Sequence, residues 1–528
     1  MNHTIKQGMA GQARHDKMFV ILALLLCAVF SLSAKTYNMQ ELGADIAGKK
    51  KCSVLINKTI EKAAAEGGGT LYFPAGEYLT GPIYMKSNIT LNIESGALIR
   101  FSDDFEDYLP FINVRWEGVF MNAFAPLINA QNAENITITG RGTIDGQGEK
   151  WWKATLNNIS QIRSKGDLEQ FSDLQRRWDD ANPNIEVSDY YKNTLKRRFF
   201  RPPFIQFLEC KNIRIDGIKI QNSPFWTINP VGCDNVLVHG VTIKNPEAGP
   251  NTDGINPSSC SNVRISNCFI SVGDDCVTIK SGRDADGRKY GKPCENITIT
   301  NCVMLSGHGG VVIGSEMSGG VKKVTISNCV FDGTDAGIRL KASRGRGGVV
   351  EEIRVDNIVM NNIQKNAFIF DLFYDRNSQL EPVSERTPVF RNIHLSNITG
   401  NNVKKVGYIT GIEEMPIEEI SFSNVNIVAE TGFTAKTAKN IQFHNVDFAV
   451  EKGASIAIVD CRDIVLDNVR TKAPLANQAI VELTDVNNAF ITNCFQLTSA
   501  DVFCKTKNSR VVWGTNFLNN VKQDNIQE

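Results

Sequence analysis

A short pattern of alternating apolar and polar residues recurs along most of the chain. It reads NITLNIESGALI from Asn88, NITITGRGTIDG from Asn135, NIRIDGIKIQNS from Asn212 and NVRISNCFISVG from Asn262, with weaker copies as far as DIVLDNVRTKA. Each copy predicts two short strands, because such alternation is typical of strands and because Asn, Asp, Gly and Ser mark the corner between them. The copies follow one another at intervals of about 20 to 40 residues, which is the spacing of a repeat architecture.

This repeat predicts an all-β fold, a single-stranded right-handed parallel β-helix. One unit of two or three short strands cannot close a core, whereas stacked units bury a continuous one. None of the copies shows a helical period, which excludes a helical solenoid. We therefore expect the 528 residues to form one elongated domain. Asn residues at equivalent corners should hydrogen-bond along the stack. Cysteines at single positions of the repeat should act as small apolar fillers, with one or two disulfides left open.

Two segments depart from the repeat. The sequence INKTIEKAAAEGGG, from Ile56, has apolar residues at helical spacing and ends in glycines, and it predicts a short N-terminal capping helix. Residues 151–200 are rich in charges and aromatic side chains, and we read them as an insertion beside the solenoid. Its aromatic rings (Trp151, Trp152, Trp178, Tyr190, Tyr191, Phe199 and Phe200) suit sugar rings, and Lys196, Arg197, Arg198 and Arg201 suit a terminal carboxylate.

The first 34 residues have the pattern of a secretory signal peptide. Lys6, Arg14 and Lys17 precede the apolar run MFVILALLLCAVFSLSA, which ends in small residues. Cleavage after Ala34 is expected, which leaves a mature domain of residues 35–528 that is secreted or periplasmic. The alternative is a retained membrane anchor, for which the apolar run is short.

The charge balance narrows the range of partners. Lys plus Arg and Asp plus Glu both number 57, so the formal net charge is zero. No overall field would draw the protein to nucleic acid or to an anionic membrane. Any acidic polymer must be held by a local basic patch, and we expect a monomer without nucleic-acid or stable membrane partners.

Four motifs break the repeat in consecutive units. They are GPNTDGI with Asn251 and Asp253, VGDDC with Asp274 and Asp275, SGHGG with His308, and GIRLK with Arg339 and Lys341. Each motif alone is weak, because a Gly-Asp-Asp turn is commonly solvated and Arg-Leu-Lys is an ordinary strand. Their spacing is close to the repeat length, however, so the side chains should converge on one wall of the solenoid.

These residue types suit the hydrolysis of a glycosidic bond in an acidic sugar polymer. One carboxylic acid must protonate the leaving oxygen while an ionised carboxylate activates water. Crowded carboxylates raise one another's pKa, which keeps one of them protonated. Arg339 offers a bidentate partner for a sugar carboxylate, and Lys341 adds a second positive charge.

With these motifs the chain resembles the polygalacturonases, glycoside hydrolase family 28. The segments GGGTLYFPAGEYLTGPI, NSPFWTINP and GHGGVVIGSEMSGGV are also similar to members of that family. The resemblance covers roughly residues 36–450, with Arg-Leu-Lys in place of the commoner Arg-Ile-Lys. It implies an inverting single displacement with no metal and no cofactor.

The resemblance also implies a role for each site residue. Asp274 is the general acid, Asp253 and Asp275 hold and activate water, and His308 tunes the acid. Arg339 and Lys341 bind the galacturonate carboxylate. The remaining residues expected to bind substrate are Asn251, Lys280 and Tyr374.

Several functions remain open at this point. We expect cleavage of α-1,4-galacturonosidic bonds in pectin or polygalacturonate, with a preference for exo attack at the non-reducing end because of the 151–200 insertion. A rhamnogalacturonan or xylogalacturonan hydrolase of the same fold is the alternative within the class. A β-helical polysaccharide lyase and a non-catalytic glycan-binding protein are alternatives from other classes.

Overall fold

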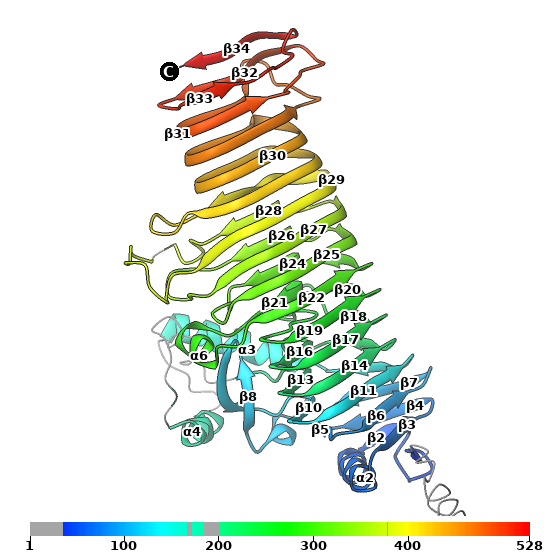
Figure 1. Ribbon diagram of the computed structural model, residues 1–528. Helices are drawn as coiled ribbons and strands as arrows, with labels where there is room; N and C mark the ends of the chain where they lie inside the picture. Colours follow the sequence, from blue (N-terminus) through cyan, green and yellow to red (C-terminus); the bar gives the residue numbers. More distant parts are fainter. Residues whose placement is uncertain (1–34, 166–171, 184, 186–199, 377, 528) are drawn as a thin grey trace, which may run out of the picture.

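The computed structural model describes residues 35–527 except 166–171, 184, 186–199 and 377. Its body is an elongated stack of coils, each formed by short strands that pair in parallel with the strands of the next coil (Figure 1). The predicted parallel β-helix is therefore confirmed. The proposed signal peptide, residues 1–34, lies outside the described residues. In the described part of the chain, none of the helices has the length and apolar character that a membrane crossing requires.

Three faces run the length of the stack. The first contains β1 (Lys35–Asn38), β3 (Gly69–Phe73), β6 (Ile89–Ile93), β11 (Glu134–Gly140), β14 (Lys211–Asp216), β17 (Asp234–His239), β19 (Ser261–Ser266) and β22 (Cys294–Thr300). The second contains β2 (Ala47–Lys51), β4 (Gly76–Thr80), β7 (Ala97–Phe101), β12 (Thr143–Asp145), β15 (Lys219–Gln221), β18 (Thr242–Lys244), β20 (Phe269–Ser271) and β23 (Val303–Ser306).

The third face carries the groove described below. It starts with β5 (Ile83–Tyr84), β10 (Ile128–Gln131), β13 (Ile205–Leu208) and β16 (Ile228–Val231). Single bridges at Ile255 connect β16 to β21 (Asp275–Ile279), and β24 (Gly309–Gly314), β26 (Ala336–Lys341) and β28 (Asn366–Asp371) follow.

Strands of the later coils continue around the corners. They are β25 (Val321–Asp332), β27 (Val349–Asn361), β29 (Val389–Thr410), β30 (Ile417–Arg470), β31 (Ala479–Thr492), β32 (Ala500–Lys507), β33 (Val511–Trp513) and β34 (Val521–Gln527).

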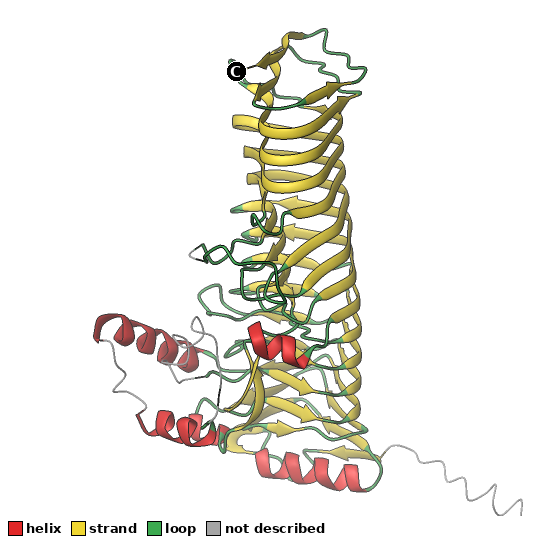
Figure 2. Cartoon of the chain, turned by 60° about the vertical axis from the view of Figure 1, so that its left-hand side comes forward, coloured by secondary structure: helices red, strands yellow, loops and turns green. Residues whose placement is uncertain are grey.

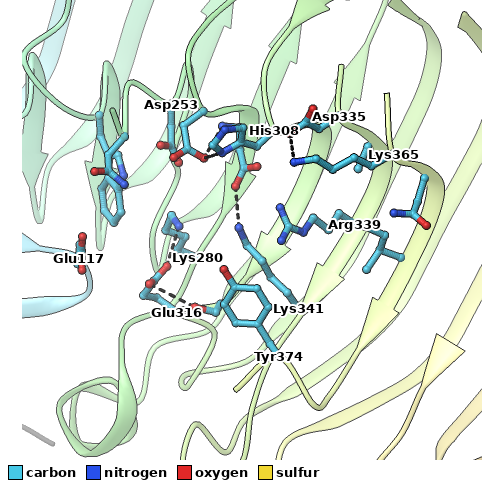
Figure 3. Close-up of a pocket in the computed structure, with 18 of the residues that line it drawn as sticks. Glu117, Asp253, Lys280, His308, Glu316, Asp335, Arg339, Lys341, Lys365 and Tyr374 are labelled. Atoms are coloured by element: carbon cyan, nitrogen blue, oxygen red, sulfur yellow. Dashed lines mark hydrogen bonds and ion pairs between the residues drawn. The ribbon is translucent and has the colours of Figure 1, made fainter. Parts of the chain in front are cut away.

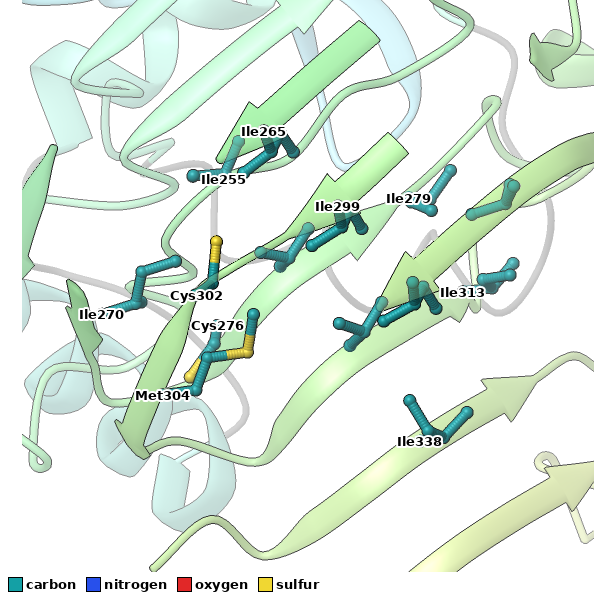
Figure 4. Packing of buried hydrophobic residues seen from close by; sticks show 14 of the residues in the cluster. Ile255, Ile265, Ile270, Cys276, Ile279, Ile299, Cys302, Met304, Ile313 and Ile338 are labelled. Carbon is teal, nitrogen blue, oxygen red and sulfur yellow. The ribbon is translucent and has the colours of Figure 1, made fainter. Parts of the chain in front are cut away.

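Inward-facing apolar side chains from all three faces form one continuous core. Ile255, Ile279, Ile299 and Ile313 come from three consecutive coils and pack together (Figure 4), and each is at most 1% exposed. The described cysteines are free thiols and are buried. The backbone N–H of Cys210 donates to the Sγ atom of Cys233 at 3.4 Å, as expected for a stack. The prediction that cysteines act as core fillers is confirmed.

The corner between the first and second faces, here called the asparagine corner, repeats one backbone conformation. Its residues have positive φ: Gly140, Gly217, Gly240, Asn267, Asn301, Asn328, Asn357, Asn397, Asn424, Asn445, Asn468 and Asn493. Glycine and asparagine adopt this left-handed region at the lowest cost. The asparagines also pair between coils, with Asn357 Nδ2 donating to Asn328 Oδ1 at 2.8 Å and Asn445 Nδ2 to Asn424 Oδ1 at 2.8 Å. The predicted asparagine ladder is confirmed.

The helix α2 (Ser53–Ala65) lies at the N-terminal end of the stack (Figure 1). It packs Ile56, Ile60 and Ala63 against the first coils, where these side chains are fully buried. It covers strand edges that would otherwise be open to other chains. The predicted capping helix is therefore confirmed.

Excursions from the coils gather beside the third face (Figure 2). They are the 3₁₀ helix η1 (Phe105–Tyr108), the antiparallel hairpin of β8 (Ile112–Trp116) and β9 (Val119–Ala123), and the helices α3 (Glu149–Lys165), α4 (Ser172–Ala181) and α6 (Asp284–Tyr290). The helices α3 and α4 belong to the segment that breaks the repeat. A small apolar cluster containing Trp116, Trp178 and Phe200 joins the hairpin to this segment.

Candidate active site

A cavity of about 520 Å³ opens on the third face, and every residue expected at the site lines it (Figure 3). These residues are Asn251, Asp253, Asp274, Asp275, Lys280, His308, Arg339, Lys341 and Tyr374. The register of the strands explains the convergence, because Asp275 pairs with Gly309, and Val312 pairs with Arg339 on the next coil.

The two adjacent aspartates occupy different depths of the groove. Asp274 lies in the turn before β21, and its side chain is 17% exposed. Asp275 begins β21, and its side chain is only 1% exposed. Because the first residue sits in a turn, the two side chains need not alternate between faces as they would within a regular strand. Both therefore line the same groove.

The third carboxylate, Asp253, is held rigidly beneath the groove. It is 2% exposed, and its Oδ2 atom accepts hydrogen bonds from Asn256 Nδ2 at 2.8 Å and Thr278 Oγ1 at 3.1 Å. One oxygen from each of Asp253, Asp274 and Asp275 lies within 4.8 Å of the others. This carboxylate cluster concentrates negative charge on side chains that are mostly buried.

The surroundings shift the pKa values of Asp253 and Asp274 in opposite directions. Burial, and then the charge of Asp274, raises the pKa of Asp253 well above its usual value. Burial alone would also raise the pKa of Asp274, but the hydrogen bond with His308 and the charge of Lys341 outweigh it, and the pKa is lowered. Asp253 therefore keeps its proton to a higher pH than Asp274 does. The Oδ1 atom of Asp275 is buried without a hydrogen-bond partner among the described residues.

His308 approaches the cluster because glycine precedes it. Gly307 has a φ of +140°, and a Cβ atom there would lie 2.4 Å from the carbonyl oxygen of Asp274. The backbone N–H of His308 donates to that oxygen at 2.9 Å, and its Nδ1 atom lies 3.2 Å from Asp274 Oδ1. The hydrogen bond to Asp274 raises the pKa of His308.

Arg339 and Lys341 point into the groove from β26, while Leu340 between them is buried in the core (Figure 3). The Lys341 Nζ atom lies 3.0 Å from Asp275 Oδ2, so Lys341 already pairs with the cluster. The Arg339 Nε atom is buried and has no hydrogen-bond partner in the described part of the chain. Both cations lie near the ring of Tyr374, at 5.7 Å for Arg339 Cζ and 5.8 Å for Lys341 Nζ.

Lys280 and Asn251 are in the groove but already have protein partners. Lys280 is buried and donates to Glu316 Oε2 at 2.7 Å. Asn251 Oδ1 accepts a hydrogen bond from Arg201 Nη2 at 2.8 Å. Their expected contact with substrate remains a prediction.

The structure also shows groove residues that the repeat pattern did not reveal. Glu316 accepts hydrogen bonds from Lys280 and from Arg283 Nη2 at 2.5 Å, and these partners hold its pKa well below the usual value despite its burial. Glu117 reaches the groove from the β8–β9 hairpin. Glu316 and Trp226 both line the groove. They lie in GSEMSGG and NSPFW, two segments that already resemble the family in the sequence. No sequence signal marked Glu117.

The role expected for the 151–200 aromatic residues as sugar platforms is wrong for the residues that are described. Trp151, Trp152, Trp178 and Phe200 are all at most 8% exposed, because they pack under the excursions. Arg201 is also buried, and its guanidinium bonds to the carbonyls of Pro224 at 2.8 Å and Pro250 at 2.5 Å. Tyr190, Tyr191, Lys196, Arg197, Arg198 and Phe199 lie outside the described residues.

The three carboxylates also lie close enough together to hold a cation. Here positive side chains occupy that position, because Lys341 contacts Asp275 and His308 contacts Asp274. Calcium takes about six to eight oxygen ligands, and an ammonium at 3.0 Å competes directly with it. The donor set therefore fits acid–base chemistry better than a calcium site.

Comparisons with known proteins agree with this geometry. Residues 188–446 match the family model described as glycosyl hydrolases family 28. A probable polygalacturonase of Vitis vinifera is 33% identical over 375 residues, which is 70% of this chain and 68% of that protein. An endo-polygalacturonase of Pectobacterium carotovorum subsp. carotovorum is 27% identical over 79% of this chain and 95% of its own length.

Among solved structures, a hyperthermoactive exopolygalacturonase from Thermotoga maritima superposes with a TM-score of 0.69 at 34% identity, covering 79% of this chain and 92% of that one. The chain is thus a glycoside hydrolase that belongs to the polygalacturonase family, glycosyl hydrolases family 28.

Proposed function

We propose that the protein hydrolyses α-1,4-galacturonosidic bonds in polygalacturonate, the acidic backbone of pectin. The observation that carries this proposal is the unpartnered Nε atom of Arg339 beside the carboxylate cluster. A buried N–H donor that stays unused is costly unless a ligand accepts from it, and a sugar carboxylate matches the geometry of a guanidinium. Tyr374, 42% exposed, offers its ring to the same sugar.

Asp274 acts as the general acid in this proposal. It is the carboxylate of the cluster that is most exposed to the groove. A bound sugar ring removes water from Asp274 and brings its own negative charge, and both effects raise the pKa of Asp274. Asp274 can then take up a proton and deliver it to the glycosidic oxygen.

Asp253 and Asp275 act together on the attacking water. Both are at most 2% exposed, so neither carboxylate can reach the anomeric carbon to form a covalent intermediate. A water molecule in the groove beside the pair can reach it. The cluster is tighter than the separation of about 6.5–9.5 Å usual for an inverting pair, but burial leaves water as the nucleophile. We therefore assign inversion by a single displacement, without metal or cofactor.

We further propose exo attack that releases single galacturonate units from the non-reducing end. Relatives of both kinds exist, since the similar proteins include an endo-polygalacturonase and an exopolygalacturonase. The β8–β9 hairpin beside the groove favours the exo mode, because Glu117 lines one side of the cavity. In this proposal the hairpin, and not the 151–200 insertion, limits the groove on that side.

The deciding experiment follows viscosity, reducing ends and products on polygalacturonate. Monomer release with little loss of viscosity supports exo attack, whereas an early collapse of viscosity with mixed oligomers contradicts it. Rhamnogalacturonan and xylogalacturonan belong in the same panel, and faster cleavage of either would reassign the substrate. A non-catalytic glycan-binding protein would release no reducing sugar.

A lyase is tested separately by its product. It would form a double bond that absorbs in the ultraviolet and would lose activity with a chelator if calcium were required. The proposed hydrolase should give no such absorbance and should keep its rate in EDTA.

Export and oligomeric state are also proposals. We infer that residues 1–34 are removed, that the mature enzyme is secreted or periplasmic, and that it is monomeric. The first residue of the mature protein should be Lys35, which N-terminal sequencing of exported protein would check. Analytical ultracentrifugation would give the molecular mass in solution and so test whether the protein is a monomer.

A further inference from the structure

The tip of the β8–β9 hairpin is docked firmly on the coil that follows β21. Arg283 donates its backbone N–H to the Gly118 carbonyl at 3.1 Å and its Nε atom to the Glu117 carbonyl at 3.1 Å. Its Nη2 atom lies 3.3 Å from Glu117 Oε2. Gly118 has a φ of +84°, and a Cβ atom there would lie 2.9 Å from Arg283 N. The hairpin therefore touches the wall of the groove at its turn.

A buried arginine anchors the hairpin from behind. Arg115 is 1% exposed, and its guanidinium lies 4.7 Å from the Phe120 ring and 4.4 Å from the Tyr290 ring. Asp286 of α6 lies 3.6 Å from its Nη2 atom. Contacts from the hairpin, α6 and the solenoid thus meet at one residue. The hairpin forms a fixed wall, which suits a role in selecting substrate.

The two sides of the cluster present opposite charges to the groove. Arg339 lies on one side and Glu117 on the other (Figure 3). On the hairpin side, Lys280 binds Glu316, and Arg283 binds both Glu316 and Glu117. The side chains of these two cations are only 5% and 6% exposed. The side chain of Glu117 is 19% exposed. The more accessible charge at this end is therefore a carboxylate.

A carboxylate accepts hydrogen bonds from hydroxyl groups and repels another carboxylate. In an α-1,4-linked chain the O4 atom of every internal unit is part of a glycosidic bond. Only the unit at the non-reducing end carries a free 4-hydroxyl group. A carboxylate at the end of the groove would favour that terminal unit and would oppose an acidic chain that continues past it.

We infer that Glu117 accepts a hydrogen bond from the terminal sugar and thereby recognises the non-reducing end of the substrate. This inference rests on the proposed function and names the residue that selects its exo mode. Glu117 lies across the cluster from Arg339. The cleaved bond would therefore lie between Glu117, which binds a hydroxyl group, and Arg339, which binds a carboxylate.

The test compares two substrates of the same length. One is saturated trigalacturonate, and the other carries a 4,5-unsaturated ring at the non-reducing end, which lacks the 4-hydroxyl group. The wild-type enzyme should have a kcat/KM about 10- to 100-fold lower on the unsaturated trimer, the range for one hydrogen bond to a charged group. Glu117→Ala and Glu117→Gln should lose rate on the saturated trimer and little on the unsaturated one, so the difference should shrink.

Glu352→Gln is the matched control. Glu352 also has a positive φ, 56° against 42° for Glu117, but it does not line the groove. It should keep the full discrimination. Equal wild-type rates on the two trimers would overturn the inference, as would an equal loss on both in the Glu117 variants. If a variant does not fold, the wild-type comparison still decides. Failure to cleave any galacturonan would instead contradict the proposed function.

Discussion

Two polar stripes run along the same coils of this solenoid and have opposite characters. The asparagine corner repeats one residue type at one backbone conformation, and its side chains pair with their counterparts on the next coil. The wall of the groove on the third face has a different residue on every coil, from Asp253 to Arg339. Asn328 and Asn357 are exposed, whereas Asp253 and Asp275 are almost completely buried.

The difference separates what the fold needs from what the chemistry needs. A hydrogen bond between exposed amides stabilises the packing of each coil on its neighbour, and the same bond can form between every pair of successive coils. Buried carboxylates destabilise one another unless cations compensate them, and such an arrangement occurs where it serves a reaction. Substitutions in the two stripes should therefore separate stability from activity.

The largest effect should come from Asp274→Asn. The variant keeps the shape of the side chain but cannot deliver a proton, so kcat should fall about 10²–10⁴-fold. Thermal unfolding should be nearly unchanged. Asp356→Asn is the control, because Asp356 is a ladder residue that accepts from Asn397 Nδ2 at 2.7 Å. A variant at position 274 that kept more than half of the wild-type rate would remove Asp274 from the mechanism.

Arg339→Ala should act mainly on KM. Loss of a charge-assisted contact to the sugar carboxylate should raise KM for galacturonate oligomers about 10- to 100-fold. Methyl-esterified oligomers lack that charge and should be affected much less. Arg354→Ala serves as the control, since Arg354 is exposed and bonds to Asn392 away from the groove. An equal loss on both substrates would show that Arg339 has a structural role.

His308→Ala should change the pH dependence of kcat/KM as well as the rate. The hydrogen bond with protonated His308 lowers the pKa of Asp274. Its removal should raise that pKa, so Asp274 should hold its proton to a higher pH. The alkaline limb of the profile should move to higher pH, with a lower maximum. In the wild type, activity should change as the pH rises through the raised pKa of His308. A profile identical to wild type at an unchanged rate would leave His308 without a catalytic role.

Asn328→Ala should leave activity intact and lower stability. Alanine loses the hydrogen bond from Asn357 and must adopt a φ of 55°, which together should cost about 1–2 kcal/mol. Asn328→Gly keeps the backbone conformation accessible and removes only the side-chain bond, so its loss should be smaller. Denaturant unfolding measures both. A clear loss of kcat without a loss of stability would break the distinction between the two stripes.

Much of this architecture could be predicted because it is periodic. The repeat predicted the coils, the asparagine ladder and the cysteine stack, and the spacing of the four motifs predicted which residues would share one wall. Register alone brings Asp275 and Arg339 to the same face.

Contacts made by the excursions could not be predicted in the same way. Glu117 reaches the groove because Arg115 of the hairpin packs on Tyr290 and because Arg283 binds the hairpin turn. Tyr290 and Arg283 both lie far from the hairpin in the sequence. The aromatic residues of the insertion looked suited to sugars, but Trp151 and Trp178 pack inside it. Composition shows which side chains are present, whereas their burial depends on the tertiary contacts of loops.

The central claim is that a buried pair of carboxylates directs water in a single displacement while Asp274 protonates the leaving oxygen. Proton NMR during the first turnovers on trigalacturonate tests it most directly, because it identifies the anomer released before mutarotation. The account predicts β-galacturonate as the first product from the α-linked substrate, with no unsaturated sugar. Initial release of the α-anomer, or of a product with a double bond, would contradict it.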